Sequence, residues 1–430
     1  MASKSLKPFP QLTLPAYERK KILQRLAGLI EKEQSQLARL ICSEVKKPIS
    51  LAQNEVRRAV AVCQDAAEES VRQHGEWLQA DVQQHTLRHQ IFSKKLPRGP
   101  LLAITPFNYP FNLPMHKIAP AMALGMPFAL KPSPRAVQTG QALVNLVHRA
   151  GWPAAAAQVL QCSNQDVMRW VWDARFAVVS FTGSADIGWR IKAEAGKKQV
   201  LLELGGNASV ILAPDALWQS ALPRLAWGAF MYAGQVCIAV QQIWVHESFY
   251  DSFIKALKKE TLRLGVGDPR RAKTLVPPLI DAAAADRVMA WIGQATAQGA
   301  KLLCGGKRQG ALVYPTVLTQ VPEQLPLVCE EAFGPVLIVH RYRNLPEVYA
   351  CVNQFRYGLQ ASIYTRSQAT AFEAFESLRM GTVLVNEIPT FRLDTMPYGG
   401  TKDSGFGREG VRFAMEHYSE PRNLVLLPAA

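Results

Sequence analysis

The 430-residue sequence predicts an α/β protein built on two parallel-sheet units, and three observations support this prediction. A segment of helical period opens the chain. From residue 100 to residue 206, short apolar runs alternate with longer amphipathic segments, and a second series of the same kind continues to residue 386. This alternation is typical of parallel strands whose connecting helices cover both faces of a sheet.

Each element follows from its local pattern. Residues 16–80 are predicted to be helical because apolar residues such as Ile22, Leu26 and Ile30 recur at helical spacing. The period changes to alternation at 85–96, and an apolar strand follows at 101–104. The first series continues with strands at 127–133, 157–162, 175–184 and 198–206 and with helices at 136–151 and 185–196. After a strand at 207–214, the second series comprises helices at 215–232, 248–263, 281–299, 345–354 and 368–379 and strands at 242–248, 312–321, 334–342, 361–365 and 381–386.

The composition is that of a folded globular protein, with 48% hydrophobic and 19% charged residues. The net charge of +15 is scattered over short basic runs that fall on predicted helices. We interpret these runs as solvated helix faces and expect no nucleic-acid binding. The longest apolar stretch, 119–130, is too short to span a bilayer and contains Gly125 and Pro127, so no membrane association is expected.

The seven cysteines contain no C-x-x-C pair. An odd number without such pairs argues against a disulfide framework and a zinc site, and it fits a reducing compartment. The N-terminus lacks the continuous apolar core of a signal peptide. We therefore expect a cytoplasmic protein without a bound metal.

One cysteine, Cys237, stands in the small and apolar stretch "FMYAGQVCIAV" (230–240). Taken alone, it is most simply a buried structural cysteine. Two polar residues change this interpretation, because Glu203 lies in an otherwise apolar strand and Asn108 follows a strand beside prolines. A thiol, a carboxylate and an amide suit a nucleophile, a base for water and an oxyanion donor. Their spacing alone does not establish that they meet.

Seven motifs in a fixed order resemble those of the aldehyde dehydrogenase superfamily. They are "TPFNYP" (105–110), "KPSP" (131–134), "FTGS" (181–184), "LELGGN" (202–207), "GQVC" (234–237), "EEAFGPV" (330–336) and "PYGGTKDSGFGREG" (397–410). The resemblance runs from about residue 16 to the end of the chain. The stretch "NEIPTFRLDTMPYGG" (386–400) is similar to the branch that includes lactaldehyde, phosphonoacetaldehyde and non-phosphorylating glyceraldehyde-phosphate dehydrogenases.

This resemblance implies that an aldehyde is oxidised to a carboxylic acid with NAD or NADP. Cys237 attacks the aldehyde carbon, and Asn108 holds the developing oxyanion together with the backbone N–H of Cys237. Glu203 activates the water that cleaves the resulting thioester. Because an enzyme that passes its acyl group to coenzyme A would not need this base, the presence of Glu203 favours hydrolysis.

The cofactor residues are also implied by the resemblance. They are Ile104, Thr105, Phe107, Lys131, Ser133, Gly183, Ser184, Gly188, Leu204, Glu331 and Phe333. Without it, Gly183 and Ser184 are an ordinary strand–helix turn, Lys131 is a strand-end lysine and Glu331 belongs to an acidic helix start. Because Pro134 and Arg135 stand where an acidic residue would repel a 2′-phosphate, we expect NADP to be tolerated and even preferred.

The substrate end is predicted to be polar. The residues expected to line it are Tyr109, Asn112, Leu113, His116, Val236, Ile238, Phe391 and Arg392. Three of these, Asn112, His116 and Arg392, favour a small polar or anionic aldehyde, with Arg392 or His116 as the anion contact. The alternative, held nearly equal, is that Arg392 points to solvent or pairs with Asp394.

The resemblance further implies a Rossmann-like cofactor domain, an α/β catalytic domain and a small β flap for oligomerisation. The expected boundaries are 1–82, 98–205 and 401–418 for the cofactor domain, 206–400 for the catalytic domain, and 83–97 and 419–430 for the flap. Exposed sheet edges in the flap predict a homodimer or homotetramer. Because the chain begins later than family members usually do, a catalytically impaired relative with a binding or structural role is the alternative.

Overall fold

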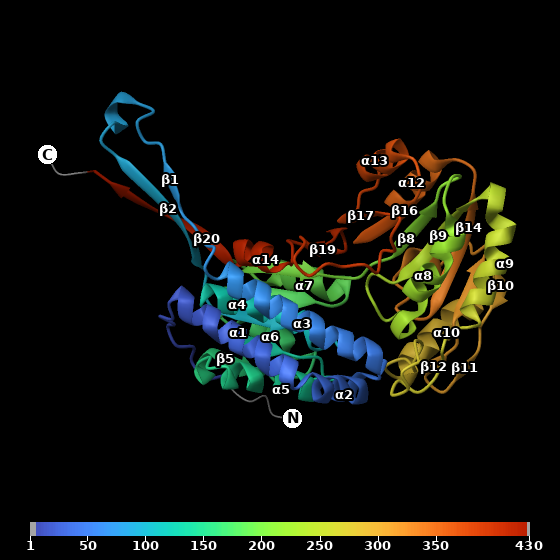
Figure 1. The fold of residues 1–430 in the computed structure, drawn as a ribbon, viewed down its shortest axis with the longest axis horizontal. Coiled ribbons are helices and arrows are strands. Elements are labelled where there is room, and N and C mark those ends of the chain that lie inside the picture. The colour runs from blue at the N-terminus through green and yellow to red at the C-terminus, as the bar shows by residue number, and fades with distance from the viewer. Residues whose placement is uncertain (1–5, 428–430) are drawn as a thin grey trace.

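Three packed helices open the chain (Figure 1). The computed structural model describes residues 6–427. The opening helices are α1 (Ala16–Lys32), α2 (Gln34–Val45) and α3 (Ile49–Glu69). Their helical-period residues, such as Leu23, Leu26 and Ile41, are fully buried, because the helices pack against one another and against the helix that follows. The predicted helical region is therefore correct as far as residue 69.

A six-stranded sheet forms the first α/β unit, with the strand order β19-β7-β6-β3-β4-β5. Its strands are β3 (Leu101–Ile104), β4 (Phe128–Lys131), β5 (Ala157–Val159), β6 (Val178–Thr182), β7 (Gln199–Glu203) and β19 (Gly405–Phe406). Five strands are parallel, and only β19 joins β7 in the antiparallel sense, with Gly405 opposite Glu203. The helices of this unit are α4 (Asn112–Leu124), α5 (Val137–Arg149), α6 (Val167–Trp172), α7 (Ala185–Glu194) and α14 (Val411–Tyr418).

The helix α4 was not predicted by the sequence analysis. All of its residues are buried, including His116 and Lys117, because it lies between α1, α3, α14 and the strand β3. A helix that is buried on every side needs no solvent-facing polar stripe, so the 3.6-residue pattern that marks surface helices is missing. Two prolines, Pro114 and Pro120, add to the irregular appearance of the segment.

A seven-stranded sheet forms the second α/β unit, in the order β10-β13-β14-β9-β8-β16-β17. Its strands are β8 (Ala208–Leu212), β9 (Val240–His246), β10 (Lys301–Cys304), β13 (Thr316–Thr319), β14 (Val336–Tyr342), β16 (Gln360–Tyr364) and β17 (Thr382–Val385). All pairs are parallel except β10 with β13. The covering helices are α8 (Trp218–Phe230), α9 (Tyr250–Thr261), α10 (Ala282–Ala297), α11 (Pro326–Cys329), α12 (Leu345–Gln354) and α13 (Gln368–Ser377).

Two short antiparallel strand pairs complete these units. They join β11 (Arg308–Gln309) to β12 (Leu312–Val313) and β15 (Tyr357–Gly358) to β18 (Thr401–Lys402). The second pair links the two units, because β15 precedes the second-sheet strand β16 and β18 precedes the first-sheet strand β19. Within residues 6–427, none of the helices combines the length and the apolar character needed to cross a bilayer.

A three-stranded arm projects from the first unit (Figure 1). It consists of β1 (Glu76–Leu78), β2 (Gln90–Pro97) and β20 (Ser419–Leu426) in the order β1-β2-β20. The strand predicted over 85–96 begins later, at Gln90, because residues 84–86 form a 3-10 turn. The arm exposes apolar side chains such as Trp77 and Leu424. Residues 428–430 of the predicted flap lie outside the described part of the chain.

Candidate active site

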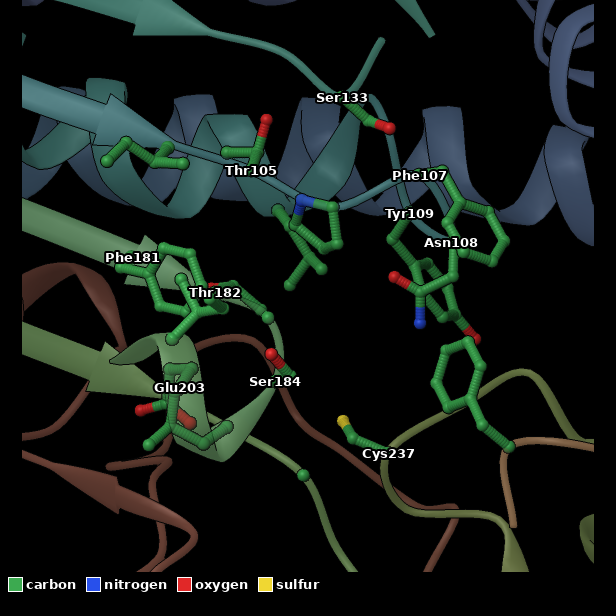
Figure 2. A pocket seen from close by; sticks show the side chains of 18 of the residues that line it. Thr105, Phe107, Asn108, Tyr109, Ser133, Phe181, Thr182, Ser184, Glu203 and Cys237 are labelled. Atoms are coloured by element: carbon green, nitrogen blue, oxygen red, sulfur yellow. The ribbon is translucent and has the colours of Figure 1, made fainter. Parts of the chain in front are cut away.

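A cavity of about 940 Å³ runs along the carboxyl ends of β3, β4, β6 and β7 and reaches loops of the second unit (Figure 2). This is the edge at which open parallel sheets bind their ligands. The predicted residues that line it are Ile104, Thr105, Phe107, Asn108, Tyr109, Asn112, Leu113, Lys131, Ser133, Gly183, Ser184, Glu203, Leu204, Val236, Cys237, Ile238, Glu331, Phe333 and Arg392. The sulfur end of the cavity comprises Asn108, Glu203, Cys237, Arg392 and Tyr398. The cofactor end comprises Lys131, Asn164, Arg169, Trp172 and Arg190.

Cys237 follows a strained turn. Tyr232, Ala233 and Gly234 all have positive φ angles, of 53°, 54° and 69°. Left-handed backbone is costly for residues with a side chain and persists where surrounding structure enforces it. Here the Tyr232 hydroxyl donates to the carbonyl oxygen of Val45 at 2.7 Å, and its backbone N–H donates to Leu275. The turn thereby presents the Cys237 side chain to the cavity.

Two glycines allow the chain to pass close to this turn. A Cβ atom on Gly206 would lie 2.2 Å from the carbonyl oxygen of Cys237, and one on Gly234 would lie 2.1 Å from that of Gly334. Any side chain at either position would push these segments apart. Because Gly206 lies three residues after Glu203, this close approach brings the end of β7 to the cysteine loop.

Asn108 lies in the loop between β3 and α4, and buried contacts fix this loop. The Asn108 amide Nδ2 donates to the carbonyl oxygen of Gln235 at 3.0 Å. The buried ammonium of Lys47 donates to the backbone carbonyl of Asn108 at 2.9 Å and pairs with Glu55 at 2.6 Å. Glu55 in turn accepts from the backbone N–H groups of residues 111 and 112, at the start of α4. In Figure 2, the Asn108 amide and the Cys237 sulfur both point into the open space.

Glu203 ends β7 with its carboxyl group in the buried part of the cavity wall. It is 3% exposed, and neither carboxyl oxygen has a hydrogen-bond partner within residues 6–427. Burial, together with the negative charge of Glu409, raises the pKa of Glu203 well above its usual range. The carboxyl group therefore holds its proton at a pH where an exposed glutamate has lost it. In Figure 2 it borders the space from the side opposite Asn108.

A buried charge cluster lies behind Glu203. Lys117 donates to Glu409 Oε1 at 2.9 Å and to Ser180 at 3.0 Å, and Arg392 Nη2 donates to Glu409 Oε2 at 3.1 Å. Burial alone would raise the pKa of Glu409, but these two cations lower it. Glu409 is therefore ionised, and its charge is one reason why Glu203 is not.

The Cys237 thiol is a weak acid in this environment. Burial, with smaller contributions from Glu331 and Glu203, raises its pKa to about 12. The Tyr398 hydroxyl lies 3.6 Å from Sγ and acts in the opposite direction. The guanidinium of Arg392 lies 3.8 Å from the centre of the Tyr398 ring and holds that ring in place.

The structure corrects one of the two predicted anion contacts. His116 does not line the cavity: it is fully buried, and its Nε2 lies 2.8 Å from Oδ1 of Asp394. Arg58 also binds Asp394 through two hydrogen bonds of 2.6 and 2.9 Å, which were not foreseen. Arg392 lines the cavity but pairs with Glu409 rather than with Asp394 or solvent. Its Nε has no partner within the described chain.

Two other predicted residues lie outside the cavity lining. Phe391 is 41% exposed, because the loop after β17 turns its side chain to the surface. Gly188 lies in α7, where a Cβ atom would sit 2.3 Å from a methyl group of Leu204. Gly188 therefore allows Leu204 to pack down onto α7, and Leu204 itself faces the cavity.

The cofactor end suits a dinucleotide. The loop Gly183–Ser184 leads into α7, where Ser184 is the N-cap residue and the first turn leaves N–H groups for an anion. Lys131 is 3% exposed, and its ammonium donates to the neutral amide of Asn164 at 2.6 Å. Thr105 has a buried hydroxyl without a partner in residues 6–427. A buried ammonium and a free hydroxyl fit the hydroxyl groups of a ribose.

Arg135 does not support the expectation of a 2′-phosphate contact. Its side chain is 57% exposed and pairs with Asp281 at 2.6 Å, away from the cavity. The remaining cations of the cofactor end are Arg169 and Arg190, on α6 and α7.

Glu331 and Phe333 close the middle of the cavity. Glu331 Oε1 accepts from the backbone N–H of Gly206 at 3.1 Å, and burial raises the pKa of Glu331 to about 7. Phe333 has a φ of 42° and meets Phe107 edge-on, with ring centres 5.9 Å apart. These rings form an apolar wall between the sulfur end and the cofactor end.

Several residues that line the cavity were not predicted from the sequence. They include Arg58, Asn164, Trp172, Trp291, Thr390 and Tyr398. For Tyr398 a signal was present, because it stands in the glycine-rich motif at 397–410. For Arg58 there was none, since an arginine on an amphipathic helix is ordinarily a surface residue.

Comparisons with known proteins agree with this geometry. The profile described as "Aldehyde dehydrogenase family" matches residues 2–424. The chain is 37% identical over 415 residues to 3-sulfolactaldehyde dehydrogenase of Priestia aryabhattai, covering 96% of this chain and 87% of that protein. The structure of aldehyde dehydrogenase 21 from Physcomitrella patens, in complex with the reaction product succinate, has a TM-score of 0.94 and 39% identity and covers 97% of this chain and 87% of that one.

A third relative is glyceraldehyde-3-phosphate dehydrogenase from Methanocaldococcus jannaschii, solved in complex with NADP. It has a TM-score of 0.92 and 36% identity and covers 97% of this chain and 91% of that one. The match of the family profile extends over nearly the whole chain and includes every segment that forms the cavity. The chain therefore belongs to the aldehyde dehydrogenase family and is an NAD(P)-dependent aldehyde dehydrogenase.

Proposed function

We propose that this enzyme oxidises a small anionic aldehyde to a carboxylic acid through a thiohemiacetal and a thioester on Cys237. The observation that supports this most strongly is the arrangement at the sulfur end. The Cys237 thiol, the Asn108 amide and the Glu203 carboxyl group are up to 129 positions apart in the sequence, and all three line one cavity. Of these three residues, only Cys237 is partly exposed. Such an arrangement supports a nucleophile with an oxyanion donor and a base.

Cys237 forms the new bond to the aldehyde carbon, and the carbonyl electron pair moves to oxygen. One N–H of the Asn108 amide is bound to Gln235, which fixes the amide and leaves the second N–H for the oxyanion. A donor that is already oriented needs no reorganisation during the reaction. The contacts of Lys47 and Glu55 keep the Asn108 loop in this position.

The nicotinamide cofactor supplies the hydride acceptor for the step from thiohemiacetal to thioester. Lys131, Ser133 and the turn Gly183–Ser184 are the residues that we propose to hold its adenosine and pyrophosphate parts, and Glu331 and Phe333 those that contact its nicotinamide half. Ile104, Thr105, Phe107 and Leu204 complete the walls. Preference for NADP over NAD is part of this proposal, and it rests on the absence of an acidic residue just after Lys131.

Glu203 removes a proton from the water that cleaves the thioester. A base with a raised pKa accepts a proton near neutral pH more readily than an ordinary carboxylate. Its ionised fraction increases with pH, so the hydrolytic step is expected to accelerate as pH rises above the range in which an exposed glutamate titrates.

The proposal of an anionic substrate rests on Arg392. Its guanidinium is 6% exposed, lines the cavity and has a buried Nε without a partner in the described residues. A carboxylate, sulfonate or phosphate at the end of a short aldehyde would accept from it. Asn112 and Tyr109 add polar groups to the same wall. The compared relatives are named for a sulfonated substrate, a carboxylate product and a phosphorylated substrate.

An aldehyde panel tests this function. The rate of reduced-nicotinamide formation is measured with succinic semialdehyde, glyceraldehyde-3-phosphate and the uncharged butanal, in the wild type and in Arg392→Met. The wild type is expected to prefer a charged aldehyde, and Arg392→Met to raise KM for it more than about tenfold while changing KM for butanal little. Equal preference for butanal in both proteins would contradict the anionic assignment.

We also propose that the arm joins copies of the chain into a homodimer or homotetramer. The outer edges of β1 and β20 and the exposed Trp77 and Leu424 support this, because open strand edges pair readily. Sedimentation velocity on the wild type and on Trp77→Lys with Leu424→Lys is the test, with a smaller species expected for the double variant.

A further inference from the structure

Tyr398 is anchored beside the reactive sulfur by contacts on every side. Its backbone N–H and carbonyl exchange hydrogen bonds of 3.0 and 2.7 Å with Glu409. Its ring carries the Arg392 guanidinium at 3.8 Å, and the residue is 3% exposed. Its hydroxyl lies 3.6 Å from Sγ of Cys237. A phenol held so firmly can direct its O–H at one atom.

We propose that Tyr398 is a catalytic residue that donates an O–H···S⁻ hydrogen bond to the Cys237 thiolate. This inference rests on the proposed role of Cys237 as the nucleophile. A thiol and a phenol can each be the donor when both are neutral, but a thiolate can only accept. The contact therefore favours the ionised form, which is the species that attacks an aldehyde.

Tyr398 acts twice in the cycle. When the C–S bond forms, the negative charge leaves sulfur for the aldehyde oxygen, and the Asn108 amide takes over. When water cleaves the thioester, the C–S bond breaks and its electron pair returns to sulfur, so the leaving thiolate again accepts from Tyr398. The phenol keeps its own proton throughout, and the proton of the original thiol is lost to solvent.

The other charged groups around the sulfur raise or lower the pKa of the Cys237 thiol. Glu331 and Glu203 face it and oppose the thiolate, whereas Arg392 favours it. Tyr109 also lies within electrostatic reach, but burial raises its pKa far above neutral, so it stays uncharged. Burial likewise raises the pKa of Tyr398 well above its usual range, so the phenol is a protonated donor at neutral pH.

The test follows the alkylation of Cys237 by iodoacetamide from pH 6 to pH 11, read by mass spectrometry of the peptide that contains it. Tyr398→Phe removes only the hydroxyl and keeps the ring under Arg392. The alkylation rate is expected to fall about tenfold at every pH in this range, as for a rise of one unit in the thiol pKa, because the wild-type thiol titrates near pH 12, above the range. Coincident pH curves would overturn the proposal.

Two controls make the result specific. Tyr357→Phe removes a phenol that lines the same cavity but donates to Glu330 at 3.1 Å, so the Cys237 curve should not move. Replacing Tyr398 by 3-fluorotyrosine keeps the shape and makes the phenol a stronger donor, so the curve should shift to lower pH. This second replacement decides the question even if Tyr398→Phe folds poorly, and a shift to higher pH would contradict the proposal.

Failure of this inference is distinguishable from failure of the proposed function. Cys237→Ser tests the nucleophile through aldehyde oxidation itself. If Cys237→Ser is inactive and Tyr398→Phe alkylates like the wild type, the nucleophile stands and the role of Tyr398 falls. If Cys237→Ser keeps full activity, both fall together.

Discussion

The two ends of the cavity are built in opposite ways. At the sulfur end, Glu203 and Arg392 are 3% and 6% exposed, and both carry polar atoms without partners within residues 6–427. At the cofactor end, the Arg169 side chain is 75% exposed and Trp172 is 55% exposed. Buried polar groups without partners cost stability, whereas exposed ones do not.

This difference indicates that the energetically unfavourable features of the cavity are concentrated around the reacting groups. The positive φ angles before Cys237, the protonated Glu203 and the bare Nε of Arg392 all gather within the sulfur end. Such features persist where function requires them. We therefore expect substitutions at the sulfur end to change rate strongly and stability in either direction, and those of the exposed residues Arg169 and Trp172 at the cofactor end to change both little.

The largest expected effect comes from Cys237→Ser. Loss of a nucleophile removes the covalent route, so kcat/KM should fall by at least about 10³-fold. The melting temperature should stay close to that of the wild type, because the side chains are nearly equal in size. Aldehyde-dependent cofactor reduction measures the rate. Cys351→Ser is the control, since Cys351 lies on α12 outside the cavity, and full activity is expected there.

Asn108→Ala comes next. Removal of one oriented oxyanion donor lowers kcat by roughly 10²–10³-fold in comparable sites. KM for NADP should change little, because Asn108 lies away from the cofactor end. Steady-state kinetics with both substrates measures the two effects separately. A kcat within about threefold of the wild type would show that another group holds the oxyanion.

The third prediction concerns the stability of the sulfur end, tested by Glu203→Gln. The pKa of Glu203 is raised in the folded state, so above about pH 4.3 the unfolded chain releases a proton that the folded chain retains, and this costs stability as pH rises. Glutamine removes this cost. The free energy of unfolding at pH 7.5 should be higher than in the wild type, and the gain should shrink towards pH 5.

Urea unfolding at several pH values measures this gain. A Gln variant that is less stable than the wild type at pH 7.5 would mean that Glu203 is ionised and well paired. Glu194→Gln is the matched control, because Glu194 lies on the surface of α7 in an exposed pair with Arg190. No pH-dependent gain is expected there.

The smallest effect is expected at the cofactor end. Arg169 is exposed and pairs only loosely with Asp166, at 3.7 Å. Exposed ion pairs contribute about 0–1 kcal/mol, so Arg169→Ala should leave the melting temperature unchanged and raise KM for NADP less than about threefold. Kinetics with NADP and with NAD checks this. A tenfold increase in KM that is confined to NADP would indicate that Arg169 contacts the 2′-phosphate. Substitutions at the two ends would then differ less in their effects than we expect.

Much of this fold could be predicted because its strands and surface helices carry clear periods. The helix at 345–354 begins and ends at the predicted residues. The helix α4 could not be predicted, since burial on all sides removes its pattern. Arg58 and Asp394 were beyond prediction as a pair, because they are 336 positions apart and meet only through tertiary packing.

The candidate site was predictable to the degree that its residues stand in short motifs. Cys237, Glu203 and Asn108 each occupy one, and all three line the cavity. His116 and Phe391 were expected to line the substrate end, but the sequence does not say where a side chain points. His116 is turned to Asp394 on the buried side of α4, and Phe391 is turned to solvent.

The most direct measurement is the mass of the Cys237 peptide after Glu203→Gln has been mixed with NADP and succinic semialdehyde and quenched in acid. If Glu203 activates the hydrolytic water, the acyl group should accumulate on Cys237 at close to one per chain, with one matching burst of reduced cofactor. A full burst that leaves the Cys237 thiol unmodified, or steady turnover at the wild-type rate, would contradict the account.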